Sequence, residues 1–323
     1  MIKNFAYVKA GTAAAAVKAL GTKGAVIHAG GTDLLGCLRE NIISADRVVS
    51  ISGIKELKGI TAKPDGGLTL GALTTIAEIA AHAAVNGKYA ALAQAAAEVA
   101  SPQLRNQGTI GGNLCQRPRC WYFRGDFPCI RKSGSLCYAL DGENQNHAIF
   151  SSGACLYVHP SDTAVALTAL QAQLTVIGPA GSRTVRIDNF FVDPAKDVTK
   201  ETILAPNEIL AEVQLPPVKG NMRSSYRKIR ARQAWDFALV SVAVVLQFDN
   251  EMVSAARIVL GGVAARPWRV EAAEKLLVGR KIDAAAAAAA AQAAVAGATP
   301  LRDNGYKIKM AQGAVEESIL ALA

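Results

Sequence analysis

Long apolar segments are absent from this 323-residue chain. Although 51% of its residues are hydrophobic and 19% are charged, no run of about 18 uncharged apolar residues occurs, so we expect no membrane span. The first residues also lack a basic region followed by an unbroken apolar core, because Lys9 and Lys18 fall inside the candidate segment. We therefore expect no secretory signal and a cytoplasmic location, with periplasmic export in folded form on a signal-bearing partner as the alternative.

Clusters of basic residues are missing as well. The formal net charge of +9 at pH 7 would be compatible with a nucleic-acid partner. Lysine and arginine are nevertheless scattered, without a long basic block or a basic strip interleaved with aromatic residues. The sequence therefore predicts a basic surface that is solvated or faces a protein partner, and no nucleic-acid binding.

The GxGxxG order of a Rossmann dinucleotide site does not occur in the turns that follow the predicted strands and helices. Two other glycine turns are present, AGGTD at 29–33 and GTIGGN at 108–113. Glycine lets backbone N–H groups approach a phosphate closely, so the pair is suited to hold two phosphates of a dinucleotide from different sides. For AGGTD alone, an ordinary tight turn is the competing interpretation.

The length predicts two or three domains with ample core. Thr12 is a candidate N-terminal cap for a helix through Leu20. Ser161 or Asp162 is a candidate N-terminal cap for a helix ending near residue 169. We place a domain boundary near 217–222, followed by an α+β unit whose closely spaced strands predict an antiparallel sheet. The other expected elements are strands at 2–9, 25–27, 47–51, 68–72 and 173–177, and helices at 75–82, 89–100, 268–278 and 283–296.

Five of the six cysteines fall between positions 115 and 155. Cys120, Cys129, Cys137 and Cys155 are separated by eight, seven and seventeen residues, with Cys115 five positions before the first. The close pairs of a structural zinc site are missing, and a large chain without an export signal argues against a disulfide framework. An iron–sulfur cluster tolerates varied spacing. From chemistry alone, cluster, zinc and inert or disulfide-bonded cysteines all stay open.

Basic residues are interspersed with these cysteines. Such cations would favour the reduced state of a negatively charged cluster and raise its potential. A solvated or partner-facing basic loop is the alternative. The residues concerned are Arg117, Arg119, Arg124, Arg131 and Lys132.

Three motifs carry a family resemblance: AGGTDLL at 29–35, RNQGTIGGNLCQ at 105–116 and SDTAVAL at 161–167. They resemble the FAD-binding medium subunit of the molybdenum hydroxylases, the xanthine dehydrogenase and carbon monoxide dehydrogenase group, over nearly the whole chain. The resemblance implies an α+β fold: a two-subdomain FAD-binding domain of the PCMH/vanillyl-alcohol-oxidase type, then a smaller α+β C-terminal domain with an antiparallel sheet. The expected ranges are 1–217, with subdomains of about 1–57 and 58–217 and an insertion of about 114–159, and 222–323.

The inserted segment resembles that of bacterial periplasmic-type aldehyde oxidoreductases, and also that of 4-hydroxybenzoyl-CoA reductase, where it binds an additional [4Fe-4S] cluster. The resemblance implies that the cluster ligands are Cys120, Cys129, Cys137 and Cys155. Cys115 is then a spare thiol, and Cys37 is expected to be a buried small residue.

The resemblance also implies the flavin site. Thr32 and Asn113 would offer side-chain hydrogen bonds to FAD; Asp162 matches an acidic position near the cofactor, with helix capping as the alternative, and Arg230 matches a position near the isoalloxazine. The segment Ala234 to Phe237 also matches a stretch near the isoalloxazine, although Trp235 and Phe237 themselves are expected to be core aromatics. His28, His147 and His159 are expected to form hydrogen bonds. The full set of expected FAD-binding residues is Ala29, Gly30, Gly31, Thr32, Asp33, Leu34, Thr109, Gly111, Gly112, Asn113, Asp162 and Arg230.

By the same resemblance, the chain is an oxidoreductase subunit that performs no substrate chemistry itself and has no catalytic residue of its own. Its partners would be a large molybdopterin subunit, a small [2Fe-2S] subunit and an external electron acceptor such as ferredoxin, in a holoenzyme that oxidises aldehydes. Three rivals are a hydroxybenzoyl-CoA reductase-like β subunit, a stand-alone FAD oxidase and a zinc-stabilised, non-enzymatic binding module.

Overall fold

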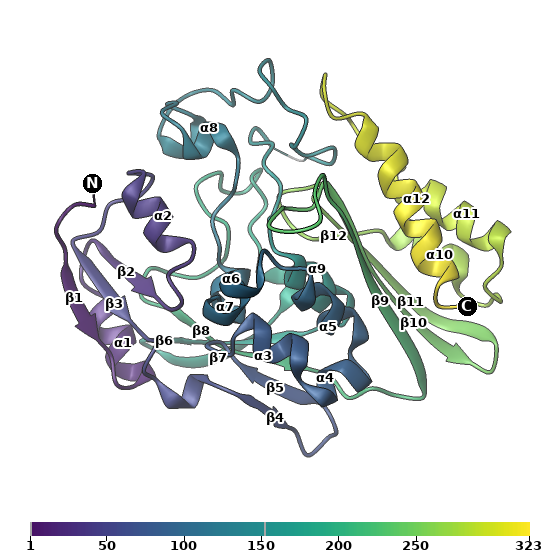
Figure 1. Ribbon diagram of the computed structural model, residues 1–323, viewed down its shortest axis with the longest axis horizontal. Helices are drawn as coiled ribbons and strands as arrows, with labels where there is room; N and C mark the ends of the chain where they lie inside the picture. Colours follow the sequence, from purple (N-terminus) through teal and green to yellow (C-terminus); the bar gives the residue numbers. More distant parts are fainter. Residues whose placement is uncertain (1, 152) are drawn as a thin grey trace.

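The computed structural model describes residues 2–151 and 153–323, and its first layer is a small parallel sheet. The strands, in the order β1-β3-β2, are Ala6–Lys9, Arg47–Ser50 and Ala25–His28. Helix α1 (Ala13–Leu20) packs on this sheet, and α2 (Leu34–Arg39) follows β2 (Figure 1). Thr12 accepts a hydrogen bond from the Ala15 amide, which confirms the predicted cap.

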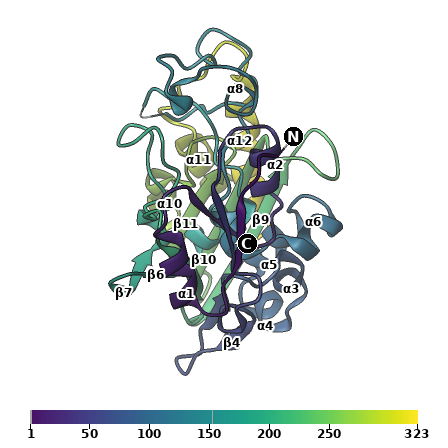
Figure 2. The same cartoon turned by 90° about the vertical axis from the view of Figure 1, so that its left-hand side faces the viewer.

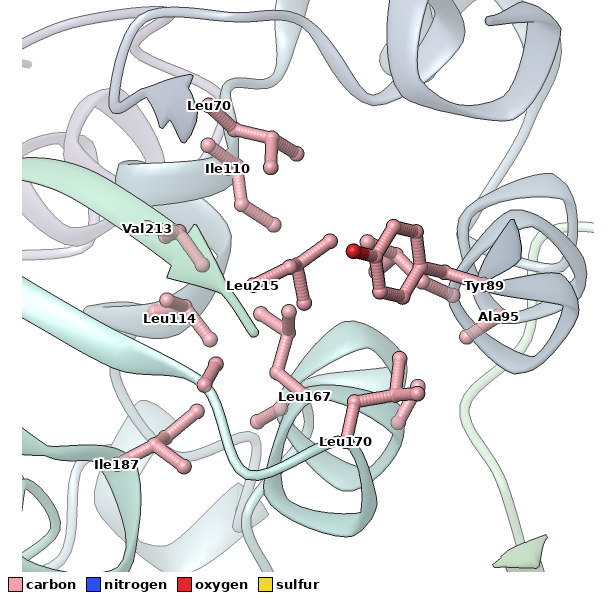
Figure 3. Close-up of a cluster of buried hydrophobic side chains, with 14 of the residues drawn as sticks. Leu70, Tyr89, Ala95, Ile110, Leu114, Leu167, Leu170, Ile187, Val213 and Leu215 are labelled. Atoms are coloured by element: carbon pink, nitrogen blue, oxygen red, sulfur yellow. The ribbon is translucent and has the colours of Figure 1, made fainter. Parts of the chain in front are cut away.

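The second layer is a five-stranded antiparallel sheet in the order β4-β5-β8-β6-β7. Its strands are Ile60–Ala62, Leu68–Gly71, Ile209–Leu215, Gln173–Gly178 and Gly181–Arg186. Short helices cover it: α3 (Ile76–Ala81), α4 (Ala83–Lys88), α5 (Ala90–Ala97), α6 (Pro102–Gln107) and α7 (Ile110–Leu114). Figure 3 shows side chains of this sheet and these helices converging on α9 (Asp162–Ala169) in one buried cluster that includes Leu70, Tyr89, Leu167 and Leu215.

The C-terminal part contains the predicted antiparallel sheet, with strands in the order β12-β11-β10-β9. These strands are Trp268–Arg269, Met252–Gly261, Val240–Asp249 and Asn221–Ile229. Helices α10 (Glu271–Leu277), α11 (Ala284–Ala294) and α12 (Tyr306–Leu320) cover one face, and α9 packs on β10 and β11. The alanine tract of α11 buries five alanines, so it is a packed helix, as predicted.

The inserted segment has little regular structure. It contains α8 (Trp121–Arg124) and a 3₁₀ turn, Ile130–Lys132; the other 3₁₀ turns of the chain are Lys55–Leu57 and Ile187–Asn189. In both views α8 lies in the upper part of the molecule (Figures 1 and 2). No helix in the described part of the chain is long and apolar enough to cross a membrane.

Candidate functional site

The two glycine turns lie against each other. A Cβ atom on Gly30 would sit 2.1 Å from the Gln107 carbonyl oxygen, so this contact requires glycine. The Gln107 side chain donates a hydrogen bond to the Gly30 carbonyl at 3.2 Å. Gly31 adopts a φ of 74°, in the left-handed region that favours glycine. The fold thus joins two turns that are far apart in sequence.

The second turn opens helix α7. The Thr109 hydroxyl accepts a hydrogen bond from the Gly112 amide at 3.2 Å, which fixes the first turn of the helix. A Cβ on Gly111 would lie 2.8 Å from the Ala72 Cβ, so a larger residue would push the turn away from the sheet.

Two cavities adjoin these turns. One, of about 260 Å³, is lined by residues 29–34, Thr109, Gly111 and Gly112 and by the Cys115 side of α7. The other, of about 530 Å³, is bounded by Thr32, Asn113, Asp162 and the loop at 232–237, and we call it the flavin cleft. Glycine turns with close backbone approach, next to a cleft of this size, fit a dinucleotide such as FAD.

Asn113 and Asp162 are held in place by buried polar partners. The Asn113 Oδ1 accepts hydrogen bonds from the Ser161 hydroxyl at 2.5 Å and the Thr163 hydroxyl at 2.6 Å. Asp162 accepts from the Tyr226 hydroxyl at 2.6 Å and from the Lys228 ammonium at 2.8 Å. Burial raises the pKa of Asp162, an effect that Lys228 and Tyr226 oppose. Ser161, and not the Asp162 side chain, caps α9.

Removal of one partner of the Asp162–Lys228 pair is expected to destabilise the fold strongly, because the Asp162 and Lys228 side chains are only 6% and 1% exposed. Asp162→Asn should lower the free energy of unfolding by about 3–5 kcal/mol, since it leaves a buried ammonium without its counter-charge. Urea denaturation measures this change. As a control, Glu317→Gln breaks an exposed pair with Arg227 and should cost less than about 1 kcal/mol. Similar losses in both variants would contradict a special role for Asp162.

The loop after β9 differs from the sequence expectation. Trp235 and Phe237 were expected in the core, but they are 64% and 45% exposed and line the flavin cleft. Trp235 has a φ of 52°, an uncommon left-handed conformation for an aromatic residue, and its amide donates to the Ala100 carbonyl. The Arg230 guanidinium pairs with Glu98 at 2.8 Å. The basic residues that line the cleft are Arg39, Arg119, Arg124, Lys228 and Arg232.

The four candidate cluster ligands gather in the inserted segment as free thiols. The Cys137 and Cys155 thiols hydrogen-bond to each other; this bond lowers the pKa of Cys137 to about 6 and, together with burial, raises the pKa of Cys155. Burial raises the pKa of Cys120 to about 11, and this thiol also interacts electrostatically with Cys129 and Cys137. Electrostatic interactions thus link Cys120 to Cys129 and Cys137, and a hydrogen bond links Cys137 to Cys155; we call these four residues the four-thiol group.

The ligands of a single metal ion must all converge on one point. Among the described residues, no group of three or more His, Cys, Asp or Glu side chains is placed to hold a metal ion in this way. The His147 Nε2 lies 3.2 Å from the Cys120 Sγ, which gives this histidine the expected hydrogen-bonding role. His159 Nδ1 accepts from the Ser161 amide at 3.4 Å.

The four arginines of the insertion turn inward and pair with two acidic residues of the FAD-binding region, whereas Lys132 donates to the Gly125 carbonyl. Asp33, in the first glycine turn, accepts from the Arg117 amide and the Arg124 guanidinium, both at 2.8 Å, and pairs with Arg119 at 3.0 Å. Glu201 pairs with Arg117 and with Arg131. Because of these contacts, the insertion is not the solvated or partner-facing basic loop that the sequence analysis left open as an alternative.

Asp33 is thus expected to hold the insertion against the first glycine turn. Asp33→Asn should reduce the free energy of unfolding by about 2–4 kcal/mol, because two largely buried guanidinium groups lose their counter-charge. Urea denaturation reports this loss, and Glu40→Gln, which breaks an exposed pair with Arg39, is the matched control at about 0.5 kcal/mol or less. Equal stability of Asp33→Asn and the parent would show that these contacts do not hold the insertion.

Some of the polar residues around the site were not predicted from sequence. Tyr226 and Lys228 occupy alternate positions of β9 and so point to the same face, a period-2 signal that the nearby Arg230 obscured. Glu201 lies in an irregular segment without a local signal. Cys37 is fully buried, as expected, and Cys115 lines the smaller cavity, where burial raises its pKa to about 12.

Comparison with known proteins agrees with this site. Residues 3–218 match the family described as "FAD binding domain in molybdopterin dehydrogenase", and residues 224–322 match the "CO dehydrogenase flavoprotein C-terminal domain". The chain is 39% identical to the aldehyde oxidoreductase FAD-binding subunit PaoB of Escherichia coli, covering 100% of this chain and 99% of that protein. It is 29% identical to the carbon monoxide dehydrogenase medium chain of Hydrogenophaga pseudoflava, over 95% of this chain and 92% of the relative.

A solved structure extends the agreement to the fold. The carbon monoxide dehydrogenase from Hydrogenophaga pseudoflava that lacks the Mo-pyranopterin moiety superimposes with a TM-score of 0.80 at 28% identity, covering 100% of this chain and 98% of that one. The resemblance read from the glycine motifs and the expected two-part fold are therefore confirmed. The chain belongs to the FAD-binding medium subunits of the molybdenum hydroxylase family.

Proposed function

We propose that this chain binds FAD and an additional [4Fe-4S] cluster and passes electrons between a small [2Fe-2S] subunit and an external acceptor. One juxtaposition carries the proposal: Arg119 lines the flavin cleft, and the next residue, Cys120, belongs to the four-thiol group. Two redox groups bound at these places would be close neighbours. Electron transfer between them would then need no large movement of the chain.

The flavin would be held mainly by backbone. The turn at 29–33 offers its amide groups to the pyrophosphate, whereas the amides of residues 110–113 already donate to acceptors within the protein. The Thr32 and Asn113 side chains lie at the border of the flavin cleft. Five basic residues line the cleft, among them Lys228, whose charge Asp162 neutralises, and Trp235 and Phe237 also line it. FAD supplies the ability to accept electrons singly and release them in pairs, and the protein positions and tunes it.

The cluster would be held by Cys120, Cys129, Cys137 and Cys155. Burial raises the pKa of Cys120, and the hydrogen bond with Cys137 together with burial raises the pKa of Cys155. Cluster assembly, which needs thiolates, would release protons from these thiols. Arg131, which pairs with Glu201, also contributes a positive charge near Cys155. These groups would make a buried, partly neutralised environment for a one-electron centre.

We further propose that the holoenzyme contains a large molybdopterin subunit and oxidises aldehydes to carboxylic acids, and that ferredoxin or a similar protein is the acceptor. The name and full-length similarity of the aldehyde oxidoreductase relative support this substrate class. A cytoplasmic location remains our proposal, with periplasmic export on a partner as the alternative.

The substrate class is tested on the complex co-purified with its partner subunits. Under anaerobic conditions, an aromatic aldehyde should bleach the flavin absorption within the enzyme's turnover time, and hydroxybenzoyl-CoA should not act as an electron acceptor from the reduced enzyme. Oxidation of the reduced complex by hydroxybenzoyl-CoA, without reduction by aldehydes, would assign the chain to the acyl-CoA reductase branch instead.

A further inference from the structure

Lys307, on the first turn of α12, is a fully buried lysine in the C-terminal domain. Its ammonium group donates to three backbone carbonyls: those of Asn146 and His147 at 3.1 Å each, and that of Gly262 at 2.8 Å. Two of these acceptors belong to the inserted segment. The side chain therefore connects a C-terminal helix to the segment that carries the cysteines.

The charge of Lys307 has no acidic partner. Within residues 2–151 and 153–323, the structure pairs the arginines of the insertion with Asp33 or Glu201, but pairs Lys307 with no carboxylate. Burial alone lowers its pKa to about 7. A buried ammonium is costly unless an opposite charge compensates it, and carbonyl groups supply only partial charge. The polypeptide by itself thus leaves this position under-compensated.

The cysteine site lies on the other side of His147. The backbone carbonyl of His147 accepts from Lys307, and its ring Nε2 is 3.2 Å from the Cys120 Sγ. Asn304, also fully buried, donates to the carbonyls of His147 and Ala148 at 3.1 Å each. The start of α12 and the residues just before it hold this histidine in place beside the thiol.

We infer that Lys307 is a positioning residue and buried counter-cation for the four-cysteine site. It holds the His147 backbone and supplies the positive charge that offsets the negative charge of a cluster bound by four thiolates. The inference rests on the proposed [4Fe-4S] cluster and assigns its electrostatic partner to a helix outside the insertion. Because reduction adds negative charge to the cluster, a nearby cation favours the reduced form.

The test uses the complex with its partner subunits and two neutral variants, Lys307→Gln and Lys307→Met. Glutamine retains hydrogen-bond donors without the charge, and methionine retains an unbranched apolar chain. Lys309→Gln is the matched control, since Lys309 is an exposed lysine of the same helix. Redox titration followed by electron paramagnetic resonance measures the midpoint potential of the cluster, and the flavin potential is measured in the same samples.

The neutral Lys307 variants should lower the cluster's midpoint potential, or lose the cluster while retaining FAD, with the flavin potential unchanged. Lys309→Gln should match the parent in both potentials. An unchanged cluster potential in a neutral variant with full iron content would overturn the inference. Joint loss of FAD and the cluster, or failure to fold, would also overturn it, because Lys307 would then support the fold as a whole. Absence of iron and sulfide from the parent complex would instead remove the proposed cluster itself.

Discussion

Gly30→Ala is expected to reduce FAD binding by at least about 100-fold, equivalent to roughly 2.7 kcal/mol. The added Cβ would lie 2.1 Å from the Gln107 carbonyl oxygen, a backbone atom that no side-chain rotation can move. The two glycine turns must therefore separate, and the amide groups that the first turn presents to the pyrophosphate lose their place against the second turn. Flavin content after purification and fluorescence titration of the flavin-free protein with FAD measure the effect.

Gly313→Ala provides the matched control for Gly30. Gly313 lies inside α12, outside both cavities beside the glycine turns, and a Cβ there would meet no atom within 4 Å. Alanine favours a helix interior over glycine by about 1 kcal/mol, so this variant should bind FAD normally and be equally or slightly more stable. Full flavin occupancy of Gly30→Ala would show that contact between the turns is not needed for binding.

Cys129→Ser is expected to abolish the [4Fe-4S] cluster while FAD stays bound. A hydroxyl is a poor substitute for a thiolate iron ligand, and Cys129 belongs to the four-thiol group. The flavin cleft and the smaller cavity do not include Cys129 in their walls, so the flavin site should persist. Iron and sulfide analysis, together with the flavin spectrum, measures both outcomes in one sample.

Cys115→Ser is the matched control for Cys129. This thiol lines the smaller cavity, not the four-thiol group, so its replacement should leave the iron content at the parental value. Loss of FAD together with the cluster in Cys129→Ser would contradict the separation of the two sites.

The elements that could be predicted from sequence are those with strong local signals. The helix expected at 161–169 forms at Asp162–Ala169, and the Ser161 hydroxyl accepts from the Ala164 amide in the manner that a cap residue indicates. The expected strand at 173–177 is β6. In such segments, capping and periodicity agree with the tertiary contacts, so local interpretation suffices.

Helix α12 shows why other features could not be predicted. Gly305 at its N-terminus provides no side-chain cap, and lysines at 307 and 309 give the first turn the pattern of an exposed surface. Only the folded chain distinguishes the buried Lys307 from the exposed Lys309, because the three carbonyls around Lys307 come from residues 45 to 161 positions away. Asp33 is similar: its motif indicates a phosphate turn, whereas its arginine partners follow from the tertiary fold alone.

We propose above all that this chain holds a flavin and a separate four-cysteine cluster. The most direct measurement compares iron, acid-labile sulfide and flavin in the parent and Cys129→Ser complexes, purified anaerobically in the same way. We predict equal flavin in both and about four more iron and four more sulfide atoms per flavin in the parent. Equal iron in the two complexes, or zinc without additional sulfide in the parent, would contradict the claim.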